Sequence, residues 1–202
     1  KEIARILEIS AGEPRALYLQ ALVASRNGDR ATMSKALGDA AHTIDAFPPQ
    51  MLYRREQLLM IGALAHSGLG NTQKAREYLE VIVTRNPSNV AARKLLATIF
   101  VRARDFARAE PHLQLLQRAI PGDPQVLFML GSWQLSLRRY VQASDYLERA
   151  ATALGGSEVN RALAFSQFGL GKGEIGLVTL EKAYAADPED VETGTMLAML
   201  YG

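Results

Sequence analysis

Cysteine is absent from the 202 residues of the chain. Its absence excludes disulfide crosslinks and thiolate chemistry, and it fits a reducing cytoplasm and an oxidising periplasm equally well. The chain also lacks a marked basic excess, because 23 Lys and Arg face 21 Asp and Glu for a formal net charge of +2. So small an excess does not drive the counterion release by which proteins bind DNA or RNA. We therefore expect no nucleic-acid partner.

Long apolar runs are missing as well. No run approaches the roughly 18 residues of a membrane-spanning helix, and Lys1 and Glu2 open onto amphipathic sequence instead of a signal peptide. With 48% hydrophobic and 22% charged residues, the chain can still bury a sizeable core without metals or crosslinks. The composition predicts a soluble, folded protein without a membrane span.

A repeat runs through the sequence. A small residue stands in the middle of each apolar stretch, at steps of 42, 34, 34, 33 and 34 residues: Ala21, Ala63, Ala97, Gly131, Ala164 and Ala198. Two further series keep these steps: Met33, Ala75, Ala109, Ala143 and Gly176, then Leu37, Leu79, Leu113, Leu147 and Leu180. Self-similarity at such a period is typical of stacked repeat proteins.

Each repeat predicts a pair of short helices. Apolar residues recur three and four positions apart on both sides of a polar or glycine break. The pairs end at Pro87, Pro121 and Pro188, with Gly155 where a proline is missing. Small residues let neighbouring helices approach closely, and the leucine series fills the seam. Because one pair cannot bury its apolar stripe alone, the pairs should stack into an all-α superhelix with a concave face.

The stretch GLGKGEIG at 169–176 has the composition of a phosphate-binding loop. A loop of the Walker type needs a glycine five residues before its Gly-Lys, a Ser or Thr after it, and a preceding strand. Ser166 and Gly173 occupy those two places, and a helix is predicted before them. In the repeat register, the stretch falls where other units carry GLGN, RARD and SLRR. We interpret it as a helix–helix turn.

No constellation of residues predicts a catalytic or metal site. His42, His66 and His112 fall at unrelated repeat positions without a neighbouring ligand. No serine has a nucleophile-elbow context, and no acid–base pair is evident. We therefore expect no enzymatic activity, no metal and no cofactor. Three basic stretches fit solvated helix ends better than an anion-binding patch: Arg54-Arg55, Arg138-Arg139 and RARDFAR at 102–108.

The repeat resembles the tetratricopeptide repeat (TPR). That family's pattern reads in one unit as Leu127, Leu130-Gly131, Tyr140, Ala143, Leu147 and Ala150. The chain departs from the pattern at Gly62, Gln134 and Gln167, where a leucine and two aromatic residues are usual. The resemblance implies an all-α, right-handed superhelical solenoid of about five helix-turn-helix units with a partial unit at each end. It implies one solenoid domain over residues 1–202, a fragment of a longer chain, with units at 1–13, 14–47, 48–89, 90–123, 124–156, 157–190 and 191–202.

Two stretches of the sequence resemble a more specific group of TPR proteins. REYLEVIVTRNPSNVAARKLLATIFVR and LGKGEIGLVTLEKAYAADPEDVETGTMLAMLY are similar to the TPR proteins of bacterial PEP-CTERM (exosortase) systems. That family implies an exported protein, often a lipoprotein, beside exopolysaccharide machinery. The expected location is then the periplasm or the outer membrane of a bacterium, and otherwise the cytoplasm.

The function that the resemblance implies is a non-catalytic scaffold that holds a peptide or protein segment in its concave groove, in exopolysaccharide or protein-sorting machinery. Two alternatives stay open. One is a structural spacer or self-assembling module, and the other is the non-catalytic repeat region of a larger enzyme such as a glycosyltransferase. Lys1 should lie inside a second helix and Gly202 inside a first helix, so apolar ends and end-to-end self-association are expected.

The groove is expected at two sites, four residues apart, on the first helix of each unit. The resemblance implies the pairs Tyr18-Leu22, Met60-Leu64, Lys94-Thr98, Phe128-Ser132, Arg161-Phe165 and Thr195-Met199, with Arg102 and Phe168 one turn on. This lining is apolar with isolated cations. It predicts a partner whose apolar anchors meet Phe128, Phe165 and Phe168 and whose acid meets Lys94 or Arg161.

The single step of 42 residues predicts an extension of one repeat. Eight extra residues fall around 42–57, where Pro48 and Pro49 cannot continue a helix but can begin one. We expect one helix to about residue 46 and another from about Pro49 to Gly68, both longer than their counterparts. Tyr53, Arg54 and Arg55 would then form a docking surface.

Overall fold

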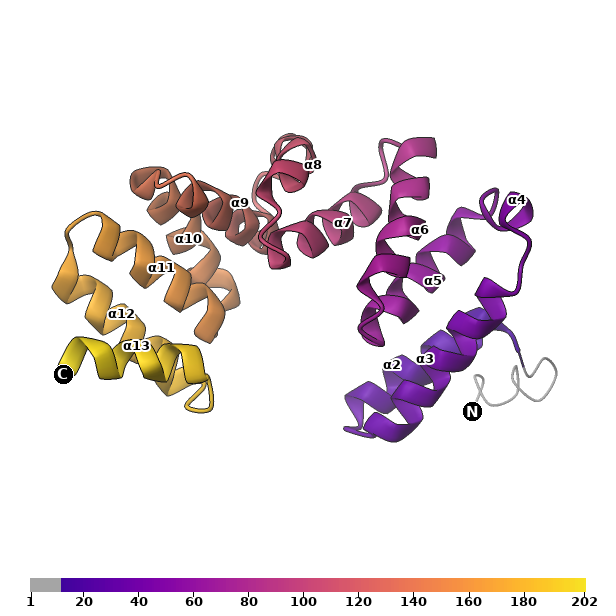
Figure 1. The fold of residues 1–202 in the computed structure, drawn as a ribbon, viewed down its shortest axis with the longest axis horizontal. Coiled ribbons are helices and arrows are strands. Elements are labelled where there is room, and N and C mark those ends of the chain that lie inside the picture. Colours follow the sequence, from indigo (N-terminus) through magenta and orange to yellow (C-terminus); the bar gives the residue numbers. More distant parts are fainter. Residues whose placement is uncertain (1–11) are drawn as a thin grey trace. The chain divides into compact units, whose positions relative to one another are not determined.

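The computed structural model describes residues 12–202, and every regular element in that range is an α-helix (Figure 1). The first helices of the pairs are α2 (Pro14–Arg26), α5 (Glu56–Gly68), α7 (Val90–Arg102), α9 (Pro124–Ser136), α11 (Ser157–Gly169) and α13 (Val191–Tyr201). The second helices are α3 (Arg30–Asp45), α6 (Thr72–Arg85), α8 (Phe106–Ala119), α10 (Tyr140–Leu154) and α12 (Gly173–Ala186). The predicted all-α fold of helix pairs is confirmed, whereas the helix expected at Lys1 lies outside the described residues.

Capping residues and prolines set the helix ends. Side chains of Glu13, Asp29, Asp105, Asp123 and Asp190 accept hydrogen bonds from backbone N–H groups in the first turns of their helices. These bonds satisfy donors that the start of a helix leaves open. Three second helices end two residues before a proline, as predicted: α6 before Pro87, α8 before Pro121 and α12 before Pro188.

The glycine-rich stretch at 169–176 forms a turn between two helices. α11 ends at Gly169, α12 begins at Gly173, and Gly171 between them has φ 73°. That left-handed conformation favours glycine, which has no Cβ to clash. The prediction of a helix–helix turn is therefore confirmed.

The chain divides into two compact units, Lys1–Ile99 (unit 1) and Phe100–Gly202 (unit 2). In unit 1, α3 packs against both α2 and α5, and α6 packs against α5. In unit 2, α10 packs against both α9 and α11, and α12 packs against both α11 and α13. A second helix thus lies between two first helices in each unit, which is how stacked repeats share a core. The single domain over 1–202 stays a prediction.

The repeating small and large residues form the cores of the units. Four alanines of the first series are at most 2% exposed: Ala21, Ala63, Ala97 and Ala164. All five leucines of the third series are at most 5% exposed: Leu37, Leu79, Leu113, Leu147 and Leu180. Ala198, the last of the first series, is exposed. The predicted pairing of small and large positions in helix packing is confirmed.

The extension departs from the prediction in its second half. α3 runs to Asp45 and has 16 residues, against 14 or 15 in the other second helices, as expected. The long helix expected from Pro49 to Gly68 is wrong. Pro49 begins only the four-residue helix α4 (Pro49–Leu52), and α5 starts after a turn at 53–55 with the 13 residues of an ordinary first helix.

Burial of one side chain accounts for that break. Leu52 is 2% exposed, and the next residue, Tyr53, donates a hydrogen bond to the Glu77 carboxylate of α6 at 3.2 Å. Turning the chain after Leu52 buries a leucine and pairs a phenol, which together offset the backbone hydrogen bonds that a continuous helix would have made. Of the predicted docking surface, Arg54 and Arg55 are exposed and Tyr53 is half-buried.

Candidate functional site

Most of the predicted groove residues of unit 1 are half-buried. Leu22 on α2 is 48% exposed. The others are half-buried: Tyr18, Met60, Leu64, Lys94 and Thr98. Tyr18 packs against the core that α2 and α3 share, and this burial raises the pKa of its phenol. The Thr98 hydroxyl donates to the backbone oxygen of Lys94 at 2.9 Å. Unit 1 thus exposes one large apolar side chain at these positions.

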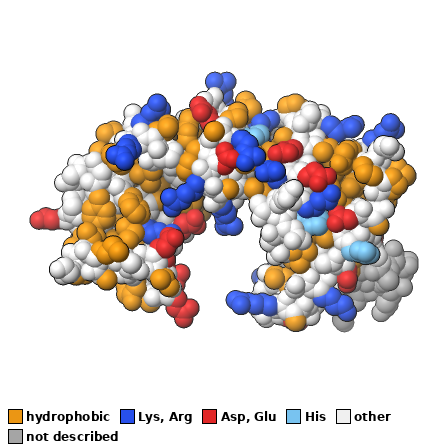
Figure 2. All heavy atoms as spheres, in the orientation of Figure 1, with side chains coloured by type: hydrophobic (Ala, Val, Ile, Leu, Met, Phe, Trp, Pro, Cys, Tyr) orange, Lys and Arg blue, Asp and Glu red, His pale blue; other side chains and the backbone are white. Residues whose placement is uncertain are grey.

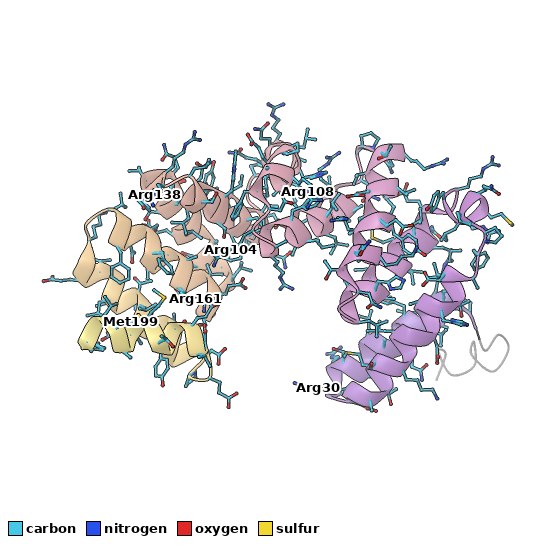
Figure 3. The ribbon with its side chains drawn as sticks, viewed as in Figure 1. Arg30, Arg104, Arg108, Arg138, Arg161 and Met199 are labelled. Carbon is cyan, nitrogen blue, oxygen red and sulfur yellow. The ribbon has the colours of Figure 1, made fainter. Side chains whose placement is uncertain are left out.

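Unit 2 exposes an apolar pair on neighbouring first helices. Phe165 on α11 is 48% exposed, and Met199, at the equivalent position of α13, is 77% exposed. Figure 2 shows hydrophobic side chains gathered over the part of unit 2 where α11, α12 and α13 lie in Figure 1, and Figure 3 marks Met199 there. Phe165 and Met199 together form the apolar pair.

Three other predicted groove residues of unit 2 serve helix packing. Phe128 is half-buried and packs against two buried clusters shared by α9, α10 and α11. The ring of Phe168 fills the space beside Gly176, where an added Cβ would lie 2.6 Å from it. The Ser132 hydroxyl donates to the backbone oxygen of Phe128 at 2.9 Å. These contacts leave Phe128 and Phe168 less open to a partner than Phe165.

The guanidinium of Arg161 is held by carboxylates of its own unit. It donates to the two oxygens of Asp190 at 2.8 and 2.7 Å and lies 2.8 Å from a carboxylate oxygen of Glu192. The Arg161 side chain is 19% exposed and that of Glu192 is 72% exposed. A partner's acid would therefore have to displace Glu192 to pair with Arg161. Arg102, by contrast, is exposed.

Asp190 joins α11 to the beginning of α13. Its carboxylate accepts hydrogen bonds from the hydroxyls of Ser157 and Thr193 and from the backbone N–H of Thr193. The hydrogen bonds from Ser157 and Thr193, with the charge of Arg161 beside them, lower the pKa of Asp190 to about 2. This cluster was not predicted from the sequence, although Ser157 begins α11 and Asp190, 33 residues later, immediately precedes α13.

A second polar cluster that was not predicted from the sequence lies in unit 1. His66 is 5% exposed and its Nε2 lies 3.1 Å from Asp45 Oδ1, the oxygen that also accepts a hydrogen bond from the Tyr78 hydroxyl. Burial, with the Asp45 carboxylate beside it, raises the pKa of Tyr78. The cluster ties α3, α5 and α6 together. Within residues 12–202 no three His, Asp or Glu side chains gather in a way that could hold a metal ion.

A depression of about 460 Å³ lies at the extended repeat of unit 1. Its lining includes Glu13, Phe47, Arg55 and Glu56. Glu13 caps α2, Glu56 accepts hydrogen bonds from Asn86 and Asn89, and the Arg55 guanidinium lies 5.7 Å from the centre of the Phe47 ring. These charged groups are engaged in local structure. None of the residues that line the depression is a predicted groove position.

Comparison with known families decides the class of the chain. A family model described as the tetratricopeptide repeat matches residues 62–124 and again residues 95–158. The chain belongs to the tetratricopeptide-repeat family. The two TPR matches overlap by one helix pair and take in α5 to α10, the helices whose spacing first indicated the repeat.

Solved structures of similar fold include other TPR proteins. The structure of MamA AMB-1 is 22% identical, with a TM-score of 0.62 over 90% of this chain and 96% of that one. MamA from Desulfovibrio magneticus RS-1 is 14% identical, with a TM-score of 0.59 over 88% and 97%. TTC0263, a thermophilic TPR protein of Thermus thermophilus, is 18% identical, with a TM-score of 0.59 over 93% and 98%. At these identities the likeness shows the fold.

One curated relative matches part of the chain. Cellulose synthase operon protein C of Pseudomonas fluorescens (strain SBW25) is 26% identical over 114 residues, which is 55% of this chain. The chain spans 9% of that relative's length. Tetratricopeptide repeats are generally non-catalytic, so the family supports a protein-interaction scaffold as the broad function. In the described part of the chain, no helix combines the length and the apolar character needed to cross a membrane.

Proposed function

We propose that unit 2 binds a protein segment through the apolar pair, Phe165 and Met199. The predicted groove positions of unit 2 are called its inner face. The observation that carries this proposal is the 48% exposure of Phe165 on α11, a first helix that has helices before and after it in the chain; Met199 holds the same repeat position on α13. Large apolar side chains in such a place are exposed at a cost unless something covers them. Binding hot spots are enriched in such anchors when a partner encloses them.

The surroundings of the apolar pair define the segment that it would accept. Arg161 lies one helical turn before Phe165 and already pairs with Asp190 and Glu192. The charge around the pair is therefore close to balanced, and the segment needs apolar anchors more than it needs an acid. This narrows the earlier expectation, in which a partner acid met Arg161. The pairing of an acid with Lys94 stays a prediction.

A place in bacterial exopolysaccharide machinery is the context that we propose for this binding. It rests on the resemblance to the PEP-CTERM TPR proteins and on the 26% match to cellulose synthase operon protein C. The exported location and the lipoprotein anchor belong to the same proposal. Fractionation of cells that make the full-length protein tests it, since recovery in the cytoplasm alone would contradict an exported function.

Selected peptides test the binding site itself. Peptides chosen from a random library on the parent chain would be measured against Phe165→Ala/Met199→Ala by fluorescence anisotropy. Loss of two anchors should weaken binding by about 30-fold, corresponding to roughly 2 kcal/mol. The matched control is Val141→Ala/Val178→Ala, which removes two valines that are 67% and 50% exposed on second helices. Equal affinity for the parent and the Phe165/Met199 variant would place the binding site elsewhere.

A further inference from the structure

One residue in each turn between paired helices has a positive φ. The five equivalent positions are Gly28 (74°), Gly70 (78°), Arg104 (54°), Arg138 (56°) and Gly171 (73°). Glycine occupies this left-handed position in three repeats, and arginine occupies it in two consecutive repeats. Residues with a Cβ adopt the conformation only under strain, because the Cβ crowds the following carbonyl oxygen. Both arginine turns lie in unit 2.

Packing does not account for the two arginines. The side chains of Arg104 and Arg138 are exposed, and neither makes a hydrogen bond, an ion pair or a ring contact with any described residue. Only their backbone N–H groups are engaged, with Val101 and Leu135. Glycine would form the same backbone bonds without strain. A strained residue whose side chain does nothing for the fold suggests a use outside it.

Other cations accompany them along the same three turns of unit 2. Arg102, Arg139 and Lys172 are exposed and make no side-chain hydrogen bond or ion pair within residues 12–202. Acidic residues within two positions of these turns are Asp105 and Glu174. Asp105 is paired with Arg108, whose guanidinium also lies 5.0 Å from the centre of the Phe100 ring. Figure 3 marks Arg104, Arg108 and Arg138 on these repeats.

We propose that these turns form a second binding surface, the arginine edge, which binds an acidic protein segment. The arginine edge consists of Arg102, Arg104, Arg138, Arg139 and Lys172. Four of its five residues stand in the turns, and the fifth, Arg102, is the last residue of α7 and one of the predicted groove positions. Guanidinium groups that are free of internal partners can bind carboxylates through paired, charge-assisted hydrogen bonds.

The chemistry of the edge favours an acidic protein segment over other polyanions. Single-stranded nucleic acids bind with the help of exposed aromatic rings on which successive bases stack. The aromatic residues that follow the turns, Phe106 and Tyr140, are half-buried, and Tyr140 packs beside Gly169. Neighbouring helices pack roughly 10 Å apart, and successive turns are two helices apart because a second helix lies between two first helices. An extended chain covers the resulting distance of roughly 20 Å in about six residues, so a segment with an acid at least at every sixth position fits the edge.

Paired variants of the full chain test the arginine edge. Arg104→Gly/Arg138→Gly restores the glycine of the other repeats, and Arg104→Lys/Arg138→Lys keeps both charges. Arg118→Gln/Lys182→Gln removes the same number of exposed cations elsewhere in unit 2. The probe is a synthetic peptide with glutamate at every third position, and its glutamine counterpart gives the background. Polygalacturonate and oligothymidylate test the other classes of polyanion.

The proposal expects a loss of binding together with a gain in stability. The glycine pair should weaken binding of the glutamate peptide by about tenfold or more at low salt, and its Tm should rise by at least about 2 °C because the strain is gone. The lysine pair should stay within about threefold of the parent chain, and the control pair within about twofold. If the control pair lost as much affinity for the glutamate peptide as the glycine pair, the effect would come from net charge alone, and the proposal would be overturned. No preference of the parent for the glutamate peptide over the glutamine peptide, or tighter binding of either other polyanion, would also overturn it.

Discussion

Gly131 and Leu147 pack so closely that a Cβ added to the glycine would lie 2.5 Å from Cγ of the leucine. Both residues belong to the repeating series, Gly131 to the small one and Leu147 to the large one. The leucine of the second helix therefore occupies the space that the small residue of the first helix leaves free. Leu147 is fully buried as a result. This contact explains why small and large residues recur at fixed positions in the repeats.

Substitution of Gly131 tests that contact. Alanine is the better helix former by about 1 kcal/mol, but here its methyl group would force Leu147 out of place, at a cost of about 1 to 3 kcal/mol. We expect Gly131→Ala to lower the free energy of unfolding in urea. Gly38→Ala is the control, because nothing lies within 4 Å of its added Cβ in α3. That variant should gain stability, and a gain in both would contradict the close contact.

The extended repeat gives a second prediction. Leu52 is the buried residue of α4, and its truncation to alanine should cost about 2 to 3 kcal/mol through lost burial and the cavity left behind. Met51→Ala, at a neighbouring side chain that is 51% exposed, should change stability by less than about 0.5 kcal/mol. Thermal unfolding of the two variants makes the comparison. Similar small effects would mean that Leu52 does not anchor the turn.

Asp190 gives a prediction about acid stability. Its pKa of about 2 lies below the value of about 3.9 that an unfolded aspartate has, so folding favours the charged form. The resulting stabilisation is complete above about pH 4 and is lost as the pH falls through about 2. Asp190→Asn should therefore be less stable by about 1 to 2 kcal/mol at neutral pH and should lose less stability between pH 4 and 2. An acid limb as steep as that of the parent chain would contradict the assignment, and exposed Asp39→Asn serves as the control.

Two buried amides give a fourth prediction. The Oε1 atoms of Gln134 and Gln167 are buried without a hydrogen-bond partner, at equivalent places on α9 and α11. A buried polar atom without a partner costs about 1 to 3 kcal/mol. Gln134→Leu should raise the free energy of unfolding by about 1 kcal/mol, whereas Gln142→Leu at an exposed position should not. A destabilised Gln134→Leu variant would show that the amide is satisfied in solution.

The sequence was sufficient for the repeat, the helix pairs and their packing. These follow from positions such as Ala63, Leu79 and Pro87, where size or backbone chemistry alone decides what fits. The turn at 53–55 was missed because a proline marks where a helix can begin and not where it ends. The burial of Leu52 and the hydrogen bond from Tyr53 to Glu77, both tertiary contacts, accompany that end.

The candidate site was harder to predict for the same reason. Periodicity places Arg161, Phe165 and Phe168 on one helix, but it does not say which neighbours they meet. Arg161 pairs with Asp190, 29 residues away, and Phe168 fills the space beside Gly176. Phe165, which has no such neighbour in the core clusters of unit 2, stays open. The positive φ of Arg104 and Arg138 could have been expected from the repeat spacing, because both residues stand where three other repeats carry glycine.

Site-specific crosslinking tests most directly the central claim that the inner face of unit 2 holds a protein segment. A photoreactive phenylalanine analogue would replace Phe165 in one sample and Val141, an exposed residue of α10, in another. After illumination with a peptide selected on the parent chain, we predict a covalent adduct from position 165 and none from position 141. An adduct from position 141 without one from position 165 would contradict the account.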